Sequence, residues 1–439
     1  MKKILSFLLM FLFFCLITKA QDVVNGQTIK RCGTEDADQI LRDNDPVYKA
    51  DRENLEKYVQ KWIEDHPNYD TKVQYTIPVV VHVLYVSSSD ANCISYSQVV
   101  SQIMATNVDW SGVNTHSMYS FSSSLKANTG VEFCLATKDP SGNTTNGVDY
   151  KQTTVASFGP TGSPQNCSGY PERCSSSGGA DAWDVTKYFN VWVCKMSDPN
   201  LCGISEFPKL GSNNNYYGST INYLYFGTIG TATSPYNLGG TLSHEAGHCF
   251  NLYHTWGDRS GQACSVTTYP GSDLCSDTPP QYTATSGHHT GVLTDACTTS
   301  SPGIMYEDFM DYSDDMDYAC FTPDQVLRIK AIATGVNASL TTSHLCTVGI
   351  NEIDAISNVS IYPNPSNGIV NVIFDNSNAN NKITITVNNL LGEMVSEIEK
   401  ENVSSVNIPI DLSEQSAGVY YIKIQSGNSI LTKKLVLLK

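Results

Sequence analysis

The sequence has few basic residues and, beyond its first 20 positions, lacks any apolar run that could cross a membrane. Lysine and arginine together number 27, against 43 aspartates and glutamates, and the formal net charge is −16. Nucleic acids and anionic membrane surfaces attract basic patches, so both are poor candidates as partners. Because a membrane helix needs about 20 consecutive apolar residues, no membrane-spanning helix is expected after the first 20 positions. The acidic balance favours calcium or basic peptides as ligands.

The long apolar run of this chain lies at its N-terminus. Lys2 and Lys3 precede the run from Ile4 to Ile17, and Ala20 offers a small residue for cleavage. Fourteen residues are too few for a comfortable span, so residues 1–20 are interpreted as a secretory signal peptide rather than an anchor. Cleavage there removes three lysines, which leaves 24 basic residues against 43 acidic ones and a net charge of −19.

The most informative motif is a His-Glu-X-X-His segment, His244 to His248, with a third histidine at position 254. Histidines at i and i+4 of a helix share one face, so His244 and His248 can hold one Zn²⁺. His254 reaches the same metal only if the chain turns near Asn251. Three protein ligands leave a fourth position for water, as in catalytic zinc sites, and Glu245 would lie beside the metal as general base.

A second motif, Phe309-Met310-Asp311-Tyr312, follows the third histidine by about sixty residues. Taken alone, a methionine in this setting indicates only core packing. After a three-histidine zinc motif, Met310 would give the imidazoles an apolar floor. Tyr312 would direct its hydroxyl at the oxyanion that forms during attack on a carbonyl.

Fourteen cysteines are many for an intracellular enzyme but ordinary for a secreted one. Cys15 would leave with the signal peptide, and the remaining thirteen are an odd number, so one thiol is expected to stay unpaired. Cys32 is the candidate, because it lies early in the chain and a thiolate is a strong zinc ligand. On the open zinc position it would displace the catalytic water and keep an enzyme latent. The alternative is that Cys32 pairs or is an inert thiol.

Between residues 264 and 297 the chain is rich in glycine, serine, threonine and proline. Asp273, Asp277 and Thr278 supply closely spaced oxygen ligands suited to Ca²⁺, although they do not follow the EF-hand pattern. The alternative is that they are turn and capping residues.

Between residues 71 and 346 the apolar pattern alternates between strands and helices. Strands are predicted at 77–85, 131–136, 189–194 and 219–225, and helices at 96–107, from about 235–238 onward through the histidines, and at 322–333. We therefore expect an α/β (α+β) domain whose central mixed sheet supports the zinc helix. An edge strand near residues 203–207 is expected to bind substrate by β-augmentation. The polar segment 21–70, with one helix at 52–63, is interpreted as a pro-segment.

Cysteine and tryptophan are absent after Cys346, and short strands follow one another. Six or seven strands at about ten-residue spacing predict a small all-β sandwich over residues 356–439, after a linker at 347–355. They are expected at 359–362, 368–374, 383–388, 393–397, 406–409, 418–425 and 429–437.

With these residues in hand, the region from residue 77 to 332 resembles the pappalysin family of metzincin metalloproteases, in particular its cytophagalysin-like branch. The resemblance rests on the histidine motif, on Ser276-Asp277-Thr278-Pro279 and on the segment from Asp308 to Asp315. The metzincin pattern has glycine where this chain has Asn251, because the turn after the helix needs left-handed φ. Asparagine tolerates that conformation next best, so the departure is slight.

The resemblance implies roles for particular residues. It implies zinc ligation by His244, His248 and His254, general-base catalysis by Glu245, a Met-turn at Met310 and transition-state stabilisation by Tyr312. It also implies calcium binding by Asp273 and Thr278, and a latency cysteine at Cys32. Proximity and resemblance together suggest four disulfides, Cys194–Cys202, Cys167–Cys174, Cys264–Cys297 and Cys275–Cys320.

The last module is similar to the C-terminal sorting domain of type IX secretion cargo in Bacteroidetes. The similarity is carried by Tyr362-Pro363-Asn364-Pro365, Leu390-Leu391-Gly392, Ala417-Gly418-Val419-Tyr420 and Lys433-Lys434-Leu435-Val436. It implies that the type IX machinery is a partner and that the protein is released or attached to the cell surface. A carbohydrate-binding module is the alternative, but the sandwich lacks an aromatic strip.

The sequence therefore predicts a secreted zinc endopeptidase with protein or peptide substrates, made as a zymogen. Asp315 would line the pocket for the residue after the scissile bond, which predicts cleavage before Arg or Lys. The alternative is a non-catalytic surface-binding protein with a structural zinc. Glu245 argues against it, because a structural zinc needs no carboxylate beside the metal. A zinc amidase acting on non-peptide amides shares the chemistry and stays open.

Overall fold

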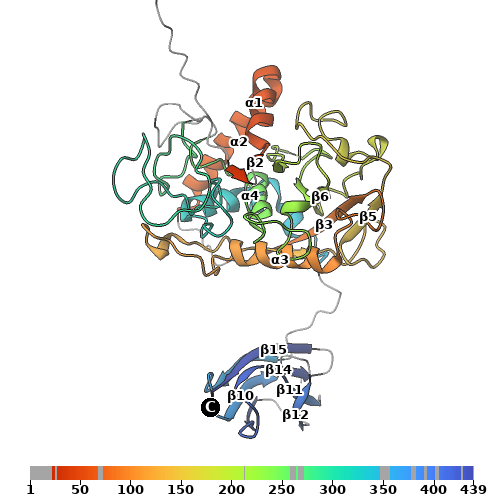
Figure 1. Cartoon of the computed structure of the whole chain (residues 1–439), viewed down its shortest axis with the longest axis vertical. Helices are drawn as coiled ribbons and strands as arrows, with labels where there is room; N and C mark the ends of the chain where they lie inside the picture. Colours follow the sequence, from red (N-terminus) through yellow and green to blue (C-terminus); the bar gives the residue numbers. More distant parts are fainter. Residues whose placement is uncertain are drawn as a thin grey trace, which may run out of the picture. The chain divides into compact units, whose positions relative to one another are not determined.

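The computed structural model describes residues 22–24, 27–67, 73–211, 213–257, 264, 271–346, 356–376, 382–389, 393–400, 405–426 and 429–438. The chain divides into two compact units, residues 1–348 and 349–439 (Figure 1). The expected signal peptide and the expected linker lie outside the described residues, as does the turn at Leu390-Leu391-Gly392.

Residues 27–67, here named the N-terminal segment, form a strand and two helices. They are β2 (Gln27–Cys32), α1 (Thr34–Asn44) and α2 (Pro46–Asp65), and β1 (Asp22–Val24) pairs with β2. The α2 helix is longer than predicted, because the Asp45 carboxylate accepts hydrogen bonds from the backbone N–H groups of Val47 and Tyr48 and so caps it. Its buried face includes Leu55, Val59 and Trp62.

The larger unit is built on a mixed sheet in the order β1-β2-β7-β8-β6-β3-β4, with β5 also paired to β3. The strands are β3 (Tyr75–Tyr85), β4 (Val131–Leu135), β5 (Val148–Gln152), β6 (Phe189–Cys194), β7 (Leu201–Ser205) and β8 (Ser219–Asn222). The predicted strand at 219–225 ends early, because the Asn222 side chain accepts a hydrogen bond from Leu224 N and caps the short helix Tyr223–Tyr225.

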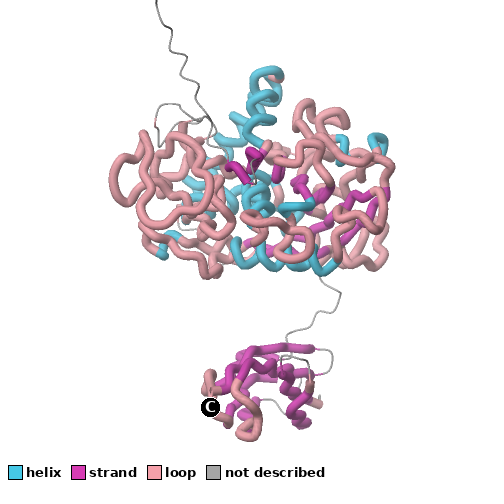
Figure 2. Tube along the Cα trace, viewed as in Figure 1, coloured by secondary structure: helices cyan, strands magenta, loops and turns pink. Residues whose placement is uncertain are grey.

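Helices α3 (Tyr96–Trp110), α4 (Gly240–Cys249) and α5 (Pro323–Ala331) complete the core of this unit (Figure 2). Trp110 on α3 donates a hydrogen bond to the carbonyl of Ser243 on α4 at 3.3 Å, which couples the two helices. Helix α4 begins a few residues later than predicted, because Gly239 has φ 90° and cannot be part of a right-handed helix. No described helix is long and apolar enough to cross a membrane.

The remaining short helices of this unit are single turns: Ser123–Leu125, Pro171–Arg173, Ser175–Ser177, Ile332–Val336 and α6 (Ala338–Thr341). Helix α5 has a complete capping box, in which Thr322 and Gln325 bond to each other's backbone, and Pro323 follows the cap.

The disulfides are partly those expected. Cys167–Cys174 and Cys264–Cys297 are confirmed, and Cys134–Cys346 joins residues 212 positions apart. The predictions of Cys194–Cys202 and Cys275–Cys320 are wrong, as is that of a single unpaired thiol. Seven cysteines form no disulfide in the described part of the chain, namely Cys32, Cys93, Cys194, Cys202, Cys249, Cys275 and Cys320. Six of the seven are buried, as is common for cysteines outside disulfides.

The smaller unit consists of two antiparallel sheets, β13-β10-β9 and β12-β11-β14-β15. Their strands are β9 (Ile356–Tyr362), β10 (Ile369–Asn376), β11 (Ile383–Asn389), β12 (Met394–Lys400), β13 (Ser405–Asp411), β14 (Gly418–Ser426) and β15 (Ser429–Leu437). Alternate residues of β11 are buried, at Ile383, Ile385 and Val387, and join one apolar core with Val370, Val372, Ile408, Ile410, Ile422, Ile424 and Leu435. All seven strands that the sequence predicts are present.

Candidate metal centre

Helix α4 carries the first two histidines of the motif, and all ten of its residues are buried. The Nδ1 atom of His244 lies 2.7 Å from the carbonyl oxygen of Phe309, and that of His248 lies 2.9 Å from the carbonyl oxygen of Leu252. With Nδ1–H donating to these carbonyls, each ring turns its Nε2 lone pair to the centre of the cluster. Burial lowers the pKa of His244 well below its ordinary value, which keeps the imidazole neutral, as a metal ligand must be.

The third histidine arrives through a turn at Asn251, whose φ is 63°. The His254 ring stacks on Trp256, with 4.4 Å between ring centres. The three Nε2 atoms lie 3.1 to 3.3 Å apart, and Cys32 Sγ lies 3.5 Å from Nε2 of His248. Among the described residues, this is the one group of three or more histidine, cysteine or acidic side chains whose ligand atoms gather closely enough to hold a metal ion.

The spacing of these four atoms fits zinc. A tetrahedral site with Zn–N bonds of about 2.0 to 2.1 Å places the nitrogens about 3.3 to 3.4 Å apart, and a Zn–S bond of about 2.3 Å places sulfur about 3.5 to 3.6 Å from each nitrogen. The three nitrogen–nitrogen distances and the distance from Cys32 Sγ to Nε2 of His248 lie within a few tenths of an ångström of those values. Three imidazoles and a thiol are also the donor types that zinc prefers.

Glu245 lies next to the cluster and is completely buried. Its Oε2 atom accepts a hydrogen bond from the Thr34 hydroxyl at 3.1 Å, and Oε1 has no hydrogen-bond partner among the described residues. Burial raises the pKa of Glu245 to about 7. The carboxylate packs on β7 at Gly203, where a Cβ atom would lie 2.7 Å from Oε1, so no larger residue fits there.

Met310 and Tyr312 lie close to the helix and the turn that carry the histidines. Met310 is completely buried, and its Sδ atom would be 2.5 Å from a Cβ atom at Gly247, so the thioether lies directly against α4. The Tyr312 ring centre lies 4.9 Å from that of His254 and 5.6 Å from that of His244. Both residues therefore contact the elements that hold the cluster.

The N-terminal segment covers this centre. Strand β2 pairs in parallel with β7, with Cys32 opposite Gly203. The guanidinium of Arg31 lies 3.0 Å from Oδ1 of Asp315 and 4.0 Å from the centre of the Tyr236 ring. Oδ2 of Asp315 accepts the backbone N–H of Gly240 at 3.2 Å, so this buried carboxylate also fixes the start of α4.

The predicted calcium residues are only partly together. The hydroxyl of Thr278 donates to both carboxylate oxygens of Asp273, at 2.9 and 2.7 Å, and burial raises the pKa of Asp273 to about 7. Asp277 instead accepts hydrogen bonds from the Thr322 hydroxyl and from Asp324 N, so it caps α5.

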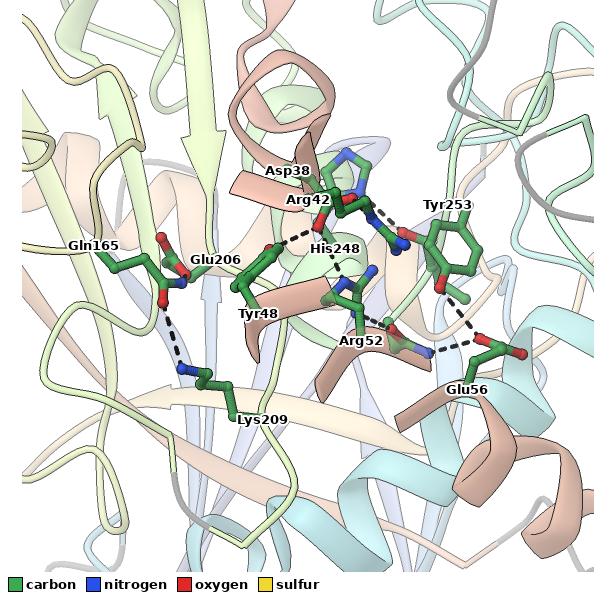
Figure 3. A network of polar contacts seen from close by, with 12 residues as sticks. Asp38, Arg42, Tyr48, Arg52, Glu56, Gln165, Glu206, Lys209, His248 and Tyr253 are labelled. Atoms are coloured by element: carbon green, nitrogen blue, oxygen red, sulfur yellow. Dashed lines mark hydrogen bonds and ion pairs between the residues drawn. The ribbon is translucent and has the colours of Figure 1, made fainter. Parts of the chain in front are cut away.

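A polar network joins α1 and α2 to the turn after α4 (Figure 3), and sequence reasoning did not predict it. Arg52 donates to Asp38 at 3.0 Å and to Oδ1 of Asn251 at 2.8 Å, and its guanidinium lies 3.6 Å from the centre of the Phe207 ring. Phe207 in turn lies edge-on to His248, with ring centres 5.4 Å apart. The spacing of residues along the chain does not predict such contacts, because Arg52 and Asn251 are 199 positions apart.

Comparison with known proteins identifies both units. The family described as Pregnancy-associated plasma protein-A matches residues 174–334, and the family described as Secretion system C-terminal sorting domain matches residues 360–438. The structure of Tannerella forsythia promirolysin is 34% identical, covers 71% of this chain and 97% of that chain, and has a TM-score of 0.61. The chain belongs to the pappalysin (M43) family of metalloproteases.

Two further relatives agree with this assignment. Mature mirolysin of Tannerella forsythia, solved with a cleaved peptide, is 36% identical, covers 62% of this chain and 98% of that chain, and has a TM-score of 0.56. An extracellular metalloprotease of Podospora anserina is 36% identical over 151 residues, which are 34% of this chain and 47% of that protein. The chain spans about half the length of the curated relatives it matches. The expected family and mixed-sheet fold are confirmed, as are the sorting domain and the extracellular location.

Proposed function

We propose that the protein is a secreted zinc endopeptidase made in a latent form. His244, His248 and His254 would hold the zinc, and Cys32 would occupy the fourth position. The observation that carries this proposal is that four zinc-type ligand atoms lie within 4.8 Å of one another, next to a buried carboxylate. The proposed organisation is the one that the sequence predicts: signal peptide 1–20, pro-segment 21–70, catalytic domain 71–346, linker 347–355 and sorting domain 356–439.

The residues around the centre support a hydrolytic mechanism. Bound zinc would supply Lewis acidity to a water molecule and to the peptide carbonyl. Glu245, whose carboxylate lies beside the cluster, would take a proton from the attacking water and pass it to the leaving amine. The hydroxyl of Tyr312 would donate to the oxyanion that develops on the carbonyl oxygen, and Met310 would support α4 from below.

Latency follows from what the N-terminal segment covers. Cys32 fills the position that water needs, and the Thr34 hydroxyl donates to Glu245 while accepting the backbone N–H of Ser205 on β7 at 2.8 Å. The same segment occupies the edge of β7, which is the strand expected to bind substrate. The likeness to promirolysin supports a zymogen, and departure of the segment would expose the metal, the base and the strand edge together.

Arg31 supports the proposed preference for cleavage before Arg or Lys. Its guanidinium lies on Asp315 and over the ring of Tyr236, which are contacts that a basic substrate side chain could make in its place. Asp315→Asn keeps an oxygen for the backbone of α4 but removes the charge. We expect its kcat/KM for Arg-containing peptides to fall toward that for matched glutamine peptides. An unchanged preference for Arg would contradict the assignment.

Calcium binding at Asp273 and Thr278 remains part of the proposal. Asp273 is a buried carboxylate whose ionised form burial disfavours, and a bound cation would compensate that charge. Titration of the chelator-treated protein with Ca²⁺ should raise the midpoint of thermal unfolding, and Asp273→Asn should remove that rise. A rise that persists in Asp273→Asn would place the calcium elsewhere.

The central test separates an enzyme from a non-catalytic binding protein with structural zinc. The activated protein, freed of the N-terminal segment, is incubated with casein or gelatin, with and without a zinc chelator. Chelator-sensitive cleavage that is lost in Glu245→Ala supports the endopeptidase. Absence of cleavage from both proteins, with zinc bound, favours the binding protein. For the C-terminal unit we propose recognition by the type IX machinery, and its deletion should abolish export.

A further inference from the structure

The carboxylate of Glu56, on α2, is held by three side chains from outside the N-terminal segment. Arg328, on α5, binds it with both terminal nitrogens, Nη1 to Oε1 at 2.8 Å and Nη2 to Oε2 at 2.7 Å. The Tyr253 hydroxyl and the Asn251 amide also donate to Oε2, at 3.3 and 3.4 Å (Figure 3). A guanidinium fork with two further donors is the geometry of a carboxylate site.

These three donors are held in place by contacts other than those to Glu56. Arg328 is completely buried, and its Nη2 atom also donates to the carbonyl of Asn251 at 3.1 Å. Its guanidinium lies 5.2 Å from the centre of the Tyr253 ring. Asn251 is completely buried, in the left-handed turn that follows α4. The catalytic unit therefore presents a preformed receptor, into which the N-terminal segment inserts one side chain.

The charges around the receptor favour an anion. Burial alone would raise the pKa of Glu56, but the Arg328 guanidinium lowers it to about 2. Arg52, one turn earlier on α2, also lowers the pKa of Glu56. Arg328 also acts on Asp273, where its charge opposes the rise in pKa that burial causes. When the N-terminal segment leaves, Arg52 and Glu56 leave together, and Arg328 loses the carboxylate that faces it. A buried guanidinium without a counter-charge is costly and binds an anion readily.

We infer that Arg328, Tyr253 and Asn251 form a carboxylate-binding site, filled by Glu56 in the latent chain and open to a carboxylate-bearing ligand once the N-terminal segment has left. The ligand can be the acidic side chain of a bound peptide or a free small carboxylate, since both have the same group. The inference rests on the proposed loss of the segment but not on proteolytic activity.

Two features place the site within reach of such ligands. Leu252, between Asn251 and Tyr253, gives its carbonyl to His248, so the receptor borders the metal centre directly. A cleft of about 730 Å³ between α1 and α2 reaches both Glu56 and Tyr253, so that solutes can approach the site even in the latent chain.

Chemical rescue in the full chain provides the first test. Glu56→Ala empties the receptor, and Glu53→Ala, an exposed position on the same helix, is the matched control. We expect the midpoint of thermal unfolding to fall in Glu56→Ala and to rise saturably with sodium acetate, but not with acetamide or with sodium chloride of equal ionic strength. An acetate-induced rise no larger in Glu56→Ala than in Glu53→Ala would overturn the inference.

A second test does not depend on the folding of Glu56→Ala and tells the two ligand sources apart. Activated protein carrying Glu245→Ala, which should bind peptides without cleaving them, is titrated with sodium acetate and with peptides that differ only in Glu or Gln. Stabilisation by acetate together with about tenfold tighter binding of a Glu peptide assigns the site to peptide side chains. Stabilisation by acetate alone assigns it to small carboxylates. If acetate does not stabilise the protein and the Glu peptide binds no more tightly than the Gln peptide, the site is refuted, whether or not the protein hydrolyses casein.

Discussion

The two ends of the N-terminal segment contact the catalytic unit in different ways. Residues 31–34 place a thiol, a guanidinium and a hydroxyl on the histidines, Asp315 and Glu245, which are the groups that would react with or bind substrate. The α2 helix instead places Arg52 and Glu56 on the turn after α4 and on α5. In the proposed latent form the first contact would block the chemistry, and the second would hold the segment in place by charge pairing.

The separation of the two contacts suggests how the segment can inhibit the enzyme strongly and still be released. A thiol on zinc is a strong but single bond to a position that water would otherwise occupy. The buried ion pair of α2 with Arg328 does not use the metal, so it can keep the segment docked while Cys32 dissociates and rebinds. Substitutions in the two contacts should therefore alter different measurements, activity for the first and segment retention for the second.

The largest effect is expected at the base that the first contact covers. Glu245→Gln keeps the shape of the side chain but removes its ability to accept a proton, so kcat of the activated protein should fall by about 10²- to 10⁴-fold. Zinc content and the midpoint of thermal unfolding should change little, since Glu245 is not among the four gathered ligand atoms. Activity within a fewfold of the unsubstituted protein would remove Glu245 from the mechanism.

Cys32→Ala should break latency without releasing the segment. With the thiol gone, the fourth position is open to water while α2 stays bound through Glu56 and Arg52, so the intact chain should gain at least tenfold in hydrolysis of a small quenched peptide. Cys93→Ala, at a free thiol that is not buried, is the control and should stay latent. If intact Cys32→Ala is as inactive as Cys93→Ala, then coverage by Arg31 and Thr34 alone is sufficient for latency.

Glu56→Gln should act on the second contact and should depend on pH. The pKa of Glu56 is lowered from about 4.5 to about 2, so its ion pair stabilises the folded chain fully above pH 4.5, and this stability is lost as the pH falls toward 2. At pH 7 the substitution should reduce the free energy of unfolding by about 3 kcal/mol, measured by urea denaturation. The difference from the unsubstituted chain should shrink between pH 4.5 and pH 2, and a constant difference across that range would contradict the ion-pair assignment.

The two contacts also differ in how far sequence reasoning could predict them. The spacing of the histidines and Glu245 along a helix predicts their cluster, because these residue types have few uses in such a pattern. Cys32 is singled out by its early position and by the affinity of a thiolate for zinc, whereas the parity argument fails because seven of the described cysteines form no disulfide. Glu56 and Arg328 are ordinary charged residues on helices 272 positions apart, and only the folded chain brings them together. The failed disulfide predictions have the same cause, because nearness in sequence does not decide whether two buried thiols meet.

Asn251 joins the two contacts, and its replacement should produce the smallest effect. Glycine adopts φ 63° without strain, so Asn251→Gly should keep the turn that brings His254 to the cluster. The amide that accepts from Arg52 and donates to Glu56 would be lost, at a cost of about 1 kcal/mol in the free energy of unfolding measured by urea denaturation.

Asn251→Asp provides the sharper comparison at this position. It keeps an acceptor for Arg52 but directs a carboxylate at Glu56, so it should destabilise the full chain more than glycine does at pH 7 and less so near pH 2, where Glu56 becomes protonated. If glycine were the more harmful substitution at both pH values, asparagine at this position would serve the turn rather than the N-terminal segment. The expected order instead indicates that the departure from the metzincin glycine adds a contact by which the turn binds α2.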